Sequence, residues 1–215
     1  MPTDSAGAAP PLPGRRGQAL RNDAVILDAA RTVFLNDPKA PVAAVAEQAG
    51  VGISALYRRY PGKEDLLRTL CHDGLRRFIT EAESAAGDPD PWRALRKFLQ
   101  RVVDADVHSL TVHLAGTFTP TPEMHDDARR AGELAGALVR RAQAAGRLRA
   151  DLVPDDIGLV LEGCASIRVP DPARTTELRQ RYLRLQLDGL AASSAQEPLP
   201  GPPPHGDLNW RWQRP

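Results

Sequence analysis

Apolar residues recur every three or four positions along most of this chain, and no stretch keeps the strict alternation that a half-buried strand requires. Proline and glycine interrupt the pattern repeatedly, as at Pro38, Gly50 and Pro61-Gly62. The chain is therefore predicted to be all-α. We expect about nine helices, over 22–36, 41–49, 53–60, 63–85, 90–107, 109–117, 122–146, 154–168 and 172–191.

Both ends of the chain are rich in proline and show no helical period. The first 20 residues are predicted to be a disordered basic arm, whose arginines we expect near DNA or in a linker. The last 23 residues are predicted to be an untethered tail, although Trp210 and Trp212 leave docking on the body or on a partner open. The predicted organisation is an arm at 1–20, a helix-turn-helix domain at 21–66, a regulatory domain at 67–192 and a tail at 193–215.

Composition excludes several classes of protein. The chain has 215 residues, with 28 Lys+Arg against 27 Asp+Glu, so any surface that attracts nucleic acid must be local. It has no apolar run of membrane-spanning length and no secretory signal pattern, so we expect a cytoplasmic protein without a membrane partner. Cys71 and Cys164 form no metal-binding pair, and the common nucleotide and hydrolase motifs are missing. We therefore predict neither catalytic residues nor a cofactor nor a metal.

The segment 41–67 carries the strongest functional pattern. Two short predicted helices flank Gly50-Val51-Gly52, which is the arrangement of a helix-turn-helix whose second helix enters the major groove. Between residues 50 and 63 the charged residues are Arg58, Arg59 and Lys63, with no acid among them. A local charge of +3 in a nearly neutral chain is suited to binding DNA phosphates.

This segment resembles the DNA-binding domain of the TetR family of transcriptional regulators. The likeness rests on ILDAARTVF at 26–34, VAEQAGVG at 45–52 and ALYRRYPGKEDLL at 55–67. It implies phosphate contacts by Tyr57, Arg59 and Lys63. It also implies base contacts by the remaining predicted DNA-binding residues, which are Ile53, Ser54, Ala55 and Arg58.

Two positions depart from the family pattern. Gly52 stands where a serine or threonine usually caps the recognition helix, and Ala40-Pro41 stands near the start of the second helix where a hydroxyl is also common. Glycine is a weaker cap than serine, by a few tenths to about one kcal/mol. The sequence therefore predicts somewhat weaker DNA binding, or compensation by the arginines.

The resemblance also implies a regulatory domain that dimerises through its last two helices and encloses a ligand pocket. The predicted interface residues are Ile157, Val160, Leu161, Cys164, Leu178, Tyr182, Leu185 and Gly189. The predicted pocket residues are Phe78, Trp92, Phe98, Val102, His108, His113, Phe118, Met124 and Glu162.

The function predicted from these observations is a homodimeric regulator of transcription that binds a palindromic operator in double-stranded DNA. Repression, with release by an unidentified small-molecule effector, is the favoured form, and ligand-independent binding or activation are alternatives. A small all-α enzyme using His108, His113 or Cys164 is a further alternative, although no nucleophile and base are suitably spaced. A metal site is disfavoured, because the five-residue spacing of His108 and His113 does not place them on one helix face.

Overall fold

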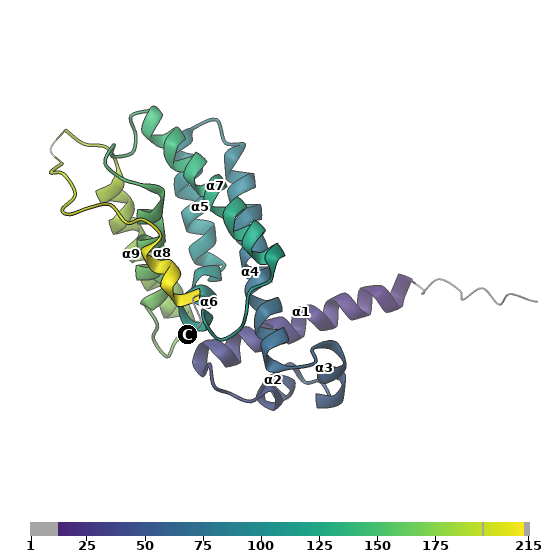
Figure 1. Ribbon diagram of the computed structural model, residues 1–215. Coiled ribbons are helices and arrows are strands. Elements are labelled where there is room, and N and C mark those ends of the chain that lie inside the picture. Colours follow the sequence, from purple (N-terminus) through teal and green to yellow (C-terminus); the bar gives the residue numbers. More distant parts are fainter. Residues whose placement is uncertain (1–12, 195, 213–215) are drawn as a thin grey trace, which may run out of the picture. The chain divides into compact units, whose positions relative to one another are not determined.

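The computed structural model describes residues 13–194 and 196–212, and within these ranges the chain is all-helical (Figure 1). Nine α-helices and one 3-10 helix, η1, follow one another with no strand among the described residues. The predicted all-α fold is confirmed. The elements are α1 (Pro13–Asn36), α2 (Val42–Ala49), α3 (Ile53–Arg59), α4 (Lys63–Ala86), α5 (Pro91–Asp104), α6 (Val107–Leu114), α7 (Pro122–Ala144), α8 (Pro154–Ser166), α9 (Pro172–Leu190) and η1 (Asp207–Trp212).

The first helix is longer than the sequence pattern indicates. It begins at Pro13 and not at residue 22, so residues 13–20 do not belong to a disordered arm. Proline at the first helical position lacks only an N–H that would be unbonded there, and its φ already suits a helix. The rest of the predicted arm, residues 1–12, lies outside the described residues.

The chain divides into two compact units after Leu66, within α4. In the first unit, α1, α2 and α3 share a small apolar core. Phe34 of α1, Val45 of α2 and Leu56 of α3 are fully buried, and Tyr60 lies beside them with 4% of its surface exposed. Burial of this kind contributes roughly 1.5–3 kcal/mol per large side chain. It fixes α2 and α3 as a helix pair.

Four helices of the second unit begin in the same way, with a proline at the first position. The side chains of Asp90, Thr121 and Asp171 accept hydrogen bonds from backbone N–H groups at the starts of α5, α7 and α9. At α8, Asp156 Oδ2 accepts from the Val153 N–H at 2.8 Å. Caps of this type are worth about 0.5–2 kcal/mol each. They explain why the sequence pattern located these four starts to within one residue.

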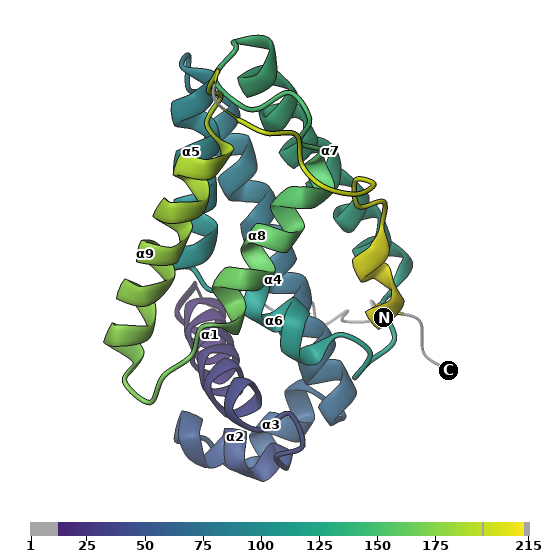
Figure 2. The ribbon, with the colours of Figure 1, turned by 90° about the vertical axis from the view of Figure 1, so that its left-hand side faces the viewer.

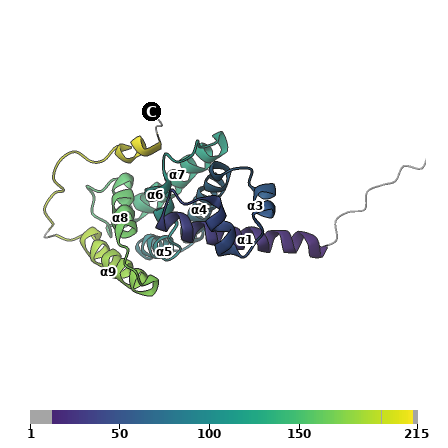
Figure 3. The ribbon, with the colours of Figure 1, turned by 90° about the horizontal axis from the view of Figure 1, so that it is seen from below.

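The core of the second unit surrounds α5, which packs against α7, α8 and α9 (Figure 2). Phe98, Leu95 and Val102 of α5 are fully buried there. After α9 the chain continues as an extended segment that ends in η1 (Figure 3). No helix in the described part of the chain has the length and apolar character needed to cross a membrane.

Candidate functional site

The turn between α2 and α3 is closed by backbone geometry. Gly50 has φ 64°, a left-handed conformation that favours glycine, and its N–H donates to the carbonyl of Glu47. Gly52 precedes α3 without a side-chain cap, as the sequence predicted. Its carbonyl accepts from the N–H groups of Ala55 and Leu56 at 2.9 and 3.1 Å. The helix-turn-helix is therefore complete although the serine or threonine cap is missing.

One side of α3 is buried and the other is exposed. Leu56 is fully buried, whereas Ile53 and Tyr57 keep 40% and 48% of their surfaces exposed. Ser54, Ala55 and Arg58 are exposed as well. Apart from Lys63, the predicted DNA-contacting residues thus lie on the exposed part of α3.

Arg59 is exposed but has a partner in the same unit. Its Nε and Nη2 atoms donate to the two carboxylate oxygens of Asp23 on α1, at 2.8 and 2.7 Å. These hydrogen bonds raise the pKa of Arg59 above its usual value, so the side chain stays charged. The prediction counted only residues 50–63 and therefore missed Asp23. Asp23 cancels part of the local positive charge.

Lys63 faces the loop before α2. Its ammonium group donates to the carbonyl oxygens of Pro38 and Ala40 at 2.8 and 2.7 Å, and lies 5.1 Å from the centre of the Phe34 ring. Burial lowers its pKa below the usual value. Lys63 therefore ties α4 to this loop, and its predicted phosphate contact stays a prediction. Among the described residues, Arg58 is the cation of α3 for which no hydrogen bond or ion pair is found.

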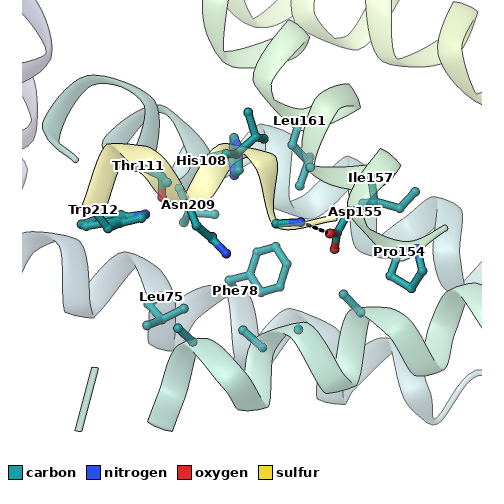
Figure 4. A pocket seen from close by; sticks show the side chains of 18 of the residues that line it. Leu75, Phe78, His108, Thr111, Pro154, Asp155, Ile157, Leu161, Asn209 and Trp212 are labelled. Atoms are coloured by element: carbon teal, nitrogen blue, oxygen red, sulfur yellow. Dashed lines mark hydrogen bonds between the residues drawn. The ribbon is translucent and has the colours of Figure 1, made fainter. Parts of the chain in front are cut away.

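The second unit contains a cavity of about 410 Å³. Its walls come from α4, α6, α7, α8 and the C-terminal segment (Figure 4). Of the predicted pocket residues, Phe78, His108 and Met124 line it. Leu75 and Thr111 also line the cavity but were not predicted, because a helical period alone does not distinguish a cavity wall from a core.

Several other predicted pocket residues have different roles. Trp92, Phe98 and Val102 belong to the buried core around α5 and do not line this cavity. His113 is hydrogen-bonded through Nδ1 to the carbonyl of Ser109. Phe118 is buried, with its ring centre 5.8 Å from that of Trp212. The apolar stripe of α5 is used for packing between helices.

The prediction of an untethered tail is wrong for the described residues. Leu208, Asn209 and Trp212 line the cavity, and Figure 4 shows Asn209 and Trp212 opposite Leu75 and Phe78 of α4. Trp210, by contrast, keeps 66% of its surface exposed. The closing NWRWQRP sequence was the signal for docking, because tryptophans are unusual in an unattached tail.

Glu162 of α8 is the charged centre near the cavity. Its Oε1 atom accepts from Arg211 Nη1 of the tail at 2.5 Å, and His108 Nε2 lies 3.5 Å away. His108 and Arg211 together lower the pKa of the Glu162 carboxyl to about 2. Glu162 is therefore ionised throughout the neutral range, next to the cavity wall.

The predicted dimer residues fall into two groups. Ile157, Val160, Leu161 and Cys164 are buried within the single chain, because the apolar stripe of α8 packs on the core of its own unit. They do not form an exposed interface. Leu185 of α9 is 61% exposed, and Leu159 of α8, which was not predicted, is 47% exposed. Leu178 and Tyr182 are half-buried and Gly189 is exposed.

Cys164 is poorly suited to nucleophilic chemistry. Burial raises the pKa of its thiol to about 11. Because the thiolate is the reactive form, nearly all of this side chain is unreactive at neutral pH. This weakens the alternative of an enzyme built on Cys164.

A helix-turn-helix unit joined to an all-α unit is an architecture that regulators of transcription use. Comparison with protein families gives a match to the bacterial regulatory proteins of the tetR family over residues 26–70. Residues 90–192 match the C-terminal domain of SbtR-like transcriptional regulators. The chain belongs to the TetR family.

Individual proteins agree with this assignment. The HTH-type transcriptional repressor LfrR of Mycolicibacterium smegmatis is 34% identical over 111 residues, which cover 50% of this chain and 58% of LfrR. The TetR regulator SCO0520 of Streptomyces coelicolor has a TM-score of 0.59 and 26% identity, over 80% of this chain and 99% of that one. The LfrR structure in complex with proflavine has a TM-score of 0.55 and 22% identity, over 84% and 99% of the two chains, which is a likeness of fold.

Proposed function

We propose that this protein is a homodimeric transcriptional repressor that binds a palindromic operator through α3 and leaves it when a small molecule occupies the cavity of the second unit. DNA binding is inferred from the exposed face of α3. Tyr57, Arg58 and Ile53 are exposed there, whereas Leu56 is buried in the core. Repression is supported by LfrR, which is named a repressor.

The side chains on α3 suit contact with a DNA groove. The guanidinium of Arg58 has the geometry to donate two hydrogen bonds to a guanine edge. Ile53 and Ala55 offer apolar contact to a thymine methyl group, and the Tyr57 hydroxyl offers a donor to a phosphate. A single helix of seven residues contacts few base pairs. A dimer with two such helices about one DNA turn apart supplies the remaining specificity.

The exposed apolar residues of α8 and α9 support self-association. Leu159 and Leu185 remain accessible although the rest of the apolar stripe on α8 is buried in the chain's own core. Burying them between two copies removes apolar surface from water. We therefore assign the dimer contact to the exposed leucines of α8 and α9, of which Leu159 also lines the cavity, and not to Ile157 and Leu161.

The coupling between ligand and DNA is assigned to α4. This helix starts at Lys63, which holds the loop before α2, and continues to residues that line the cavity, such as Leu75 and Phe78. A ligand that binds the non-DNA form more tightly shifts the population towards that form, whereas a ligand with equal affinity for both forms shifts nothing. Displacement of α4 is the movement that this proposal requires.

The test is a selection of bound sequences from random duplex DNA with the full chain, followed by native mass spectrometry of the complex. The proposal predicts a palindromic consensus with half-sites about one turn apart, and two chains on each duplex. A folded protein that enriches no sequence, or that binds the selected site as one chain, would contradict it. For the effector, a compound that raises the melting temperature must also weaken operator binding.

A further inference from the structure

The C-terminal strap, residues 197–212, is attached to the second unit at a few defined points. Arg149 Nη2 donates to the Glu197 carbonyl at 2.9 Å, and the Leu199 N–H donates to Asp151 Oδ2 at 2.9 Å. Between these points and η1 the chain is dominated by prolines, which favour an extended and relatively stiff backbone. The strap therefore carries η1 across to the cavity as a separate piece of structure.

At the cavity the strap is held by charge and by aromatic packing. The Gly206 N–H donates to Asp155 Oδ2 at 2.7 Å, which Figure 4 marks, and Arg211 is paired with Glu162. The rings of Trp212 and Phe118 meet edge to face. The Arg211–Glu162 pair is shielded from water, since the two side chains are only 22% and 16% exposed. Its loss leaves a shielded carboxylate with His108 alone beside it.

The strap also supplies part of the cavity wall. Asn209 and Trp212 face the space from one side, and Leu75 and Phe78 face it from the other. A molecule that fills this space has to contact both sides. Ligand binding and docking of the strap then stabilise each other. A bound ligand must hold the strap in place, and loss of the strap must lower the affinity for the ligand.

The charges around the cavity limit the ligand. Among the described residues, no lysine or arginine lines it, whereas Asp155 and Asp207 do. The guanidinium of Arg211, which lies on the strap, is already paired with Glu162. Apart from His108, which lies beside the carboxylate of Glu162, an anion entering this space would lose its hydration without gaining a cationic partner. The other lining side chains are mostly aliphatic or aromatic.

We propose that the strap is the movable half of the ligand site, and that its ligand is a compact, largely apolar molecule without a negative charge that is clamped between Trp212 and α4. The proposal rests on the proposed function in taking this cavity as the effector site. It assigns different roles to the two tryptophans of η1: Trp212 contacts the ligand and Trp210 does not. Arg211 and Glu162 are positioning residues that keep Trp212 in the wall.

Two dyes with one skeleton test the charge requirement. N-phenyl-1-naphthylamine is neutral and apolar, and 1-anilinonaphthalene-8-sulfonate adds a sulfonate to the same rings. We expect the full chain to bind the neutral dye at least 10-fold more tightly, as measured by fluorescence titration without DNA. Equal or tighter binding of the sulfonate, or no binding of the neutral dye, would overturn the proposal.

Matched variants test the strap. Trp212→Ala is expected to weaken neutral-dye binding by 10-fold or more, and Trp210→Ala to change it less than twofold. Glu162→Gln keeps the cavity wall intact and should lower the affinity for the neutral dye through faster dissociation. Arg174→Ala, at the exposed Arg174–Glu177 pair, is its control and should have no effect. Unchanged or stronger binding in both Trp212→Ala and Glu162→Gln would overturn the proposal.

Hydrogen exchange supplies a second readout that needs no substitution. The neutral dye is expected to slow exchange of the backbone amides of 206–212 at least fivefold, and the same amides should exchange faster in Glu162→Gln. If the dye leaves the exchange rates of these amides unchanged, the ligand is not clamped by the strap. Neither measurement involves DNA. Failure to bind an operator would therefore leave the strap assignment standing, and failure here would leave DNA binding standing.

Discussion

The two units each contain an arginine–carboxylate pair that joins segments far apart in the chain, but the surroundings of the pairs differ. Arg59 binds Asp23 across 36 positions and its side chain is 61% exposed. Arg211 binds Glu162 across 49 positions and its side chain is 22% exposed. Water and salt screen the first pair, which is therefore worth only about 0.2–1 kcal/mol. The second pair is shielded and costs more to break.

The difference in exposure of the two ion pairs agrees with the role proposed for each region. An exposed guanidinium can exchange its carboxylate partner for a DNA phosphate at little cost, so the Arg59–Asp23 pair is compatible with binding DNA. The Arg211–Glu162 pair instead holds a segment with few other buried contacts. Weakly held segments of this kind are the ones that move when ligands bind.

The largest expected effect comes from forcing the strap off through its backbone. Gly116 has φ 75°, and a Cβ atom there would lie 2.9 Å from the carbonyl oxygen of Arg211. We expect Gly116→Ala to lower the free energy of unfolding by about 1–3 kcal/mol and to release the strap. Urea denaturation and hydrogen exchange of 206–212 measure both effects. Gly132→Ala, where a Cβ meets no atom within 4 Å, is the control and should be neutral or stabilising.

A smaller effect is expected from removing the charge of Glu162. Because its pKa lies at about 2 when folded, below the ordinary 4.5, the ionised carboxyl favours the folded state above the unfolded pKa. This contribution is lost as the pH falls towards 2. Glu162→Gln should therefore lower the free energy of unfolding by about 1 kcal/mol at pH 7. Thermal melts from pH 7 to pH 2.5 should show the two proteins converging, and a constant difference would contradict the assignment.

The smallest effect on stability is expected at the exposed pair. Asp23→Asn should change the free energy of unfolding by less than about 1 kcal/mol. It removes the carboxylate that competes with phosphate for Arg59, so the affinity for any duplex should rise at a fixed salt concentration. Asp28→Asn removes the same charge from α1 and is the control. If Asp23→Asn raises the affinity no more than Asp28→Asn does, Arg59 is not a phosphate contact.

Much of the fold follows from local sequence signals. Helix starts such as Pro91 and Pro122 were predicted because proline and its preceding cap act within a few residues. The long-range contacts were not predicted. Asp23 lies 36 positions from Arg59, so a count of charges along one segment could not include it. Trp212 packs against Phe118, and although Phe118 was a predicted pocket residue, its pairing with a side chain of the tail was not predicted. The buried stripe of α8 was misassigned because a core and an interface share the same helical period.

The central claim is that the exposed face of α3 recognises a DNA sequence. It is tested most directly by the affinity ratio of Arg58→Ala, compared with the wild type, for a selected operator and for a scrambled duplex of equal length at one salt concentration. Loss of a bidentate guanine contact is expected to lower that ratio by about 5- to 150-fold, which corresponds to roughly 1–3 kcal/mol, and to relax the preference at one base position. An unchanged ratio, with the variant folded and still bound to DNA, would contradict the assignment of Arg58 on α3 as a base-reading residue.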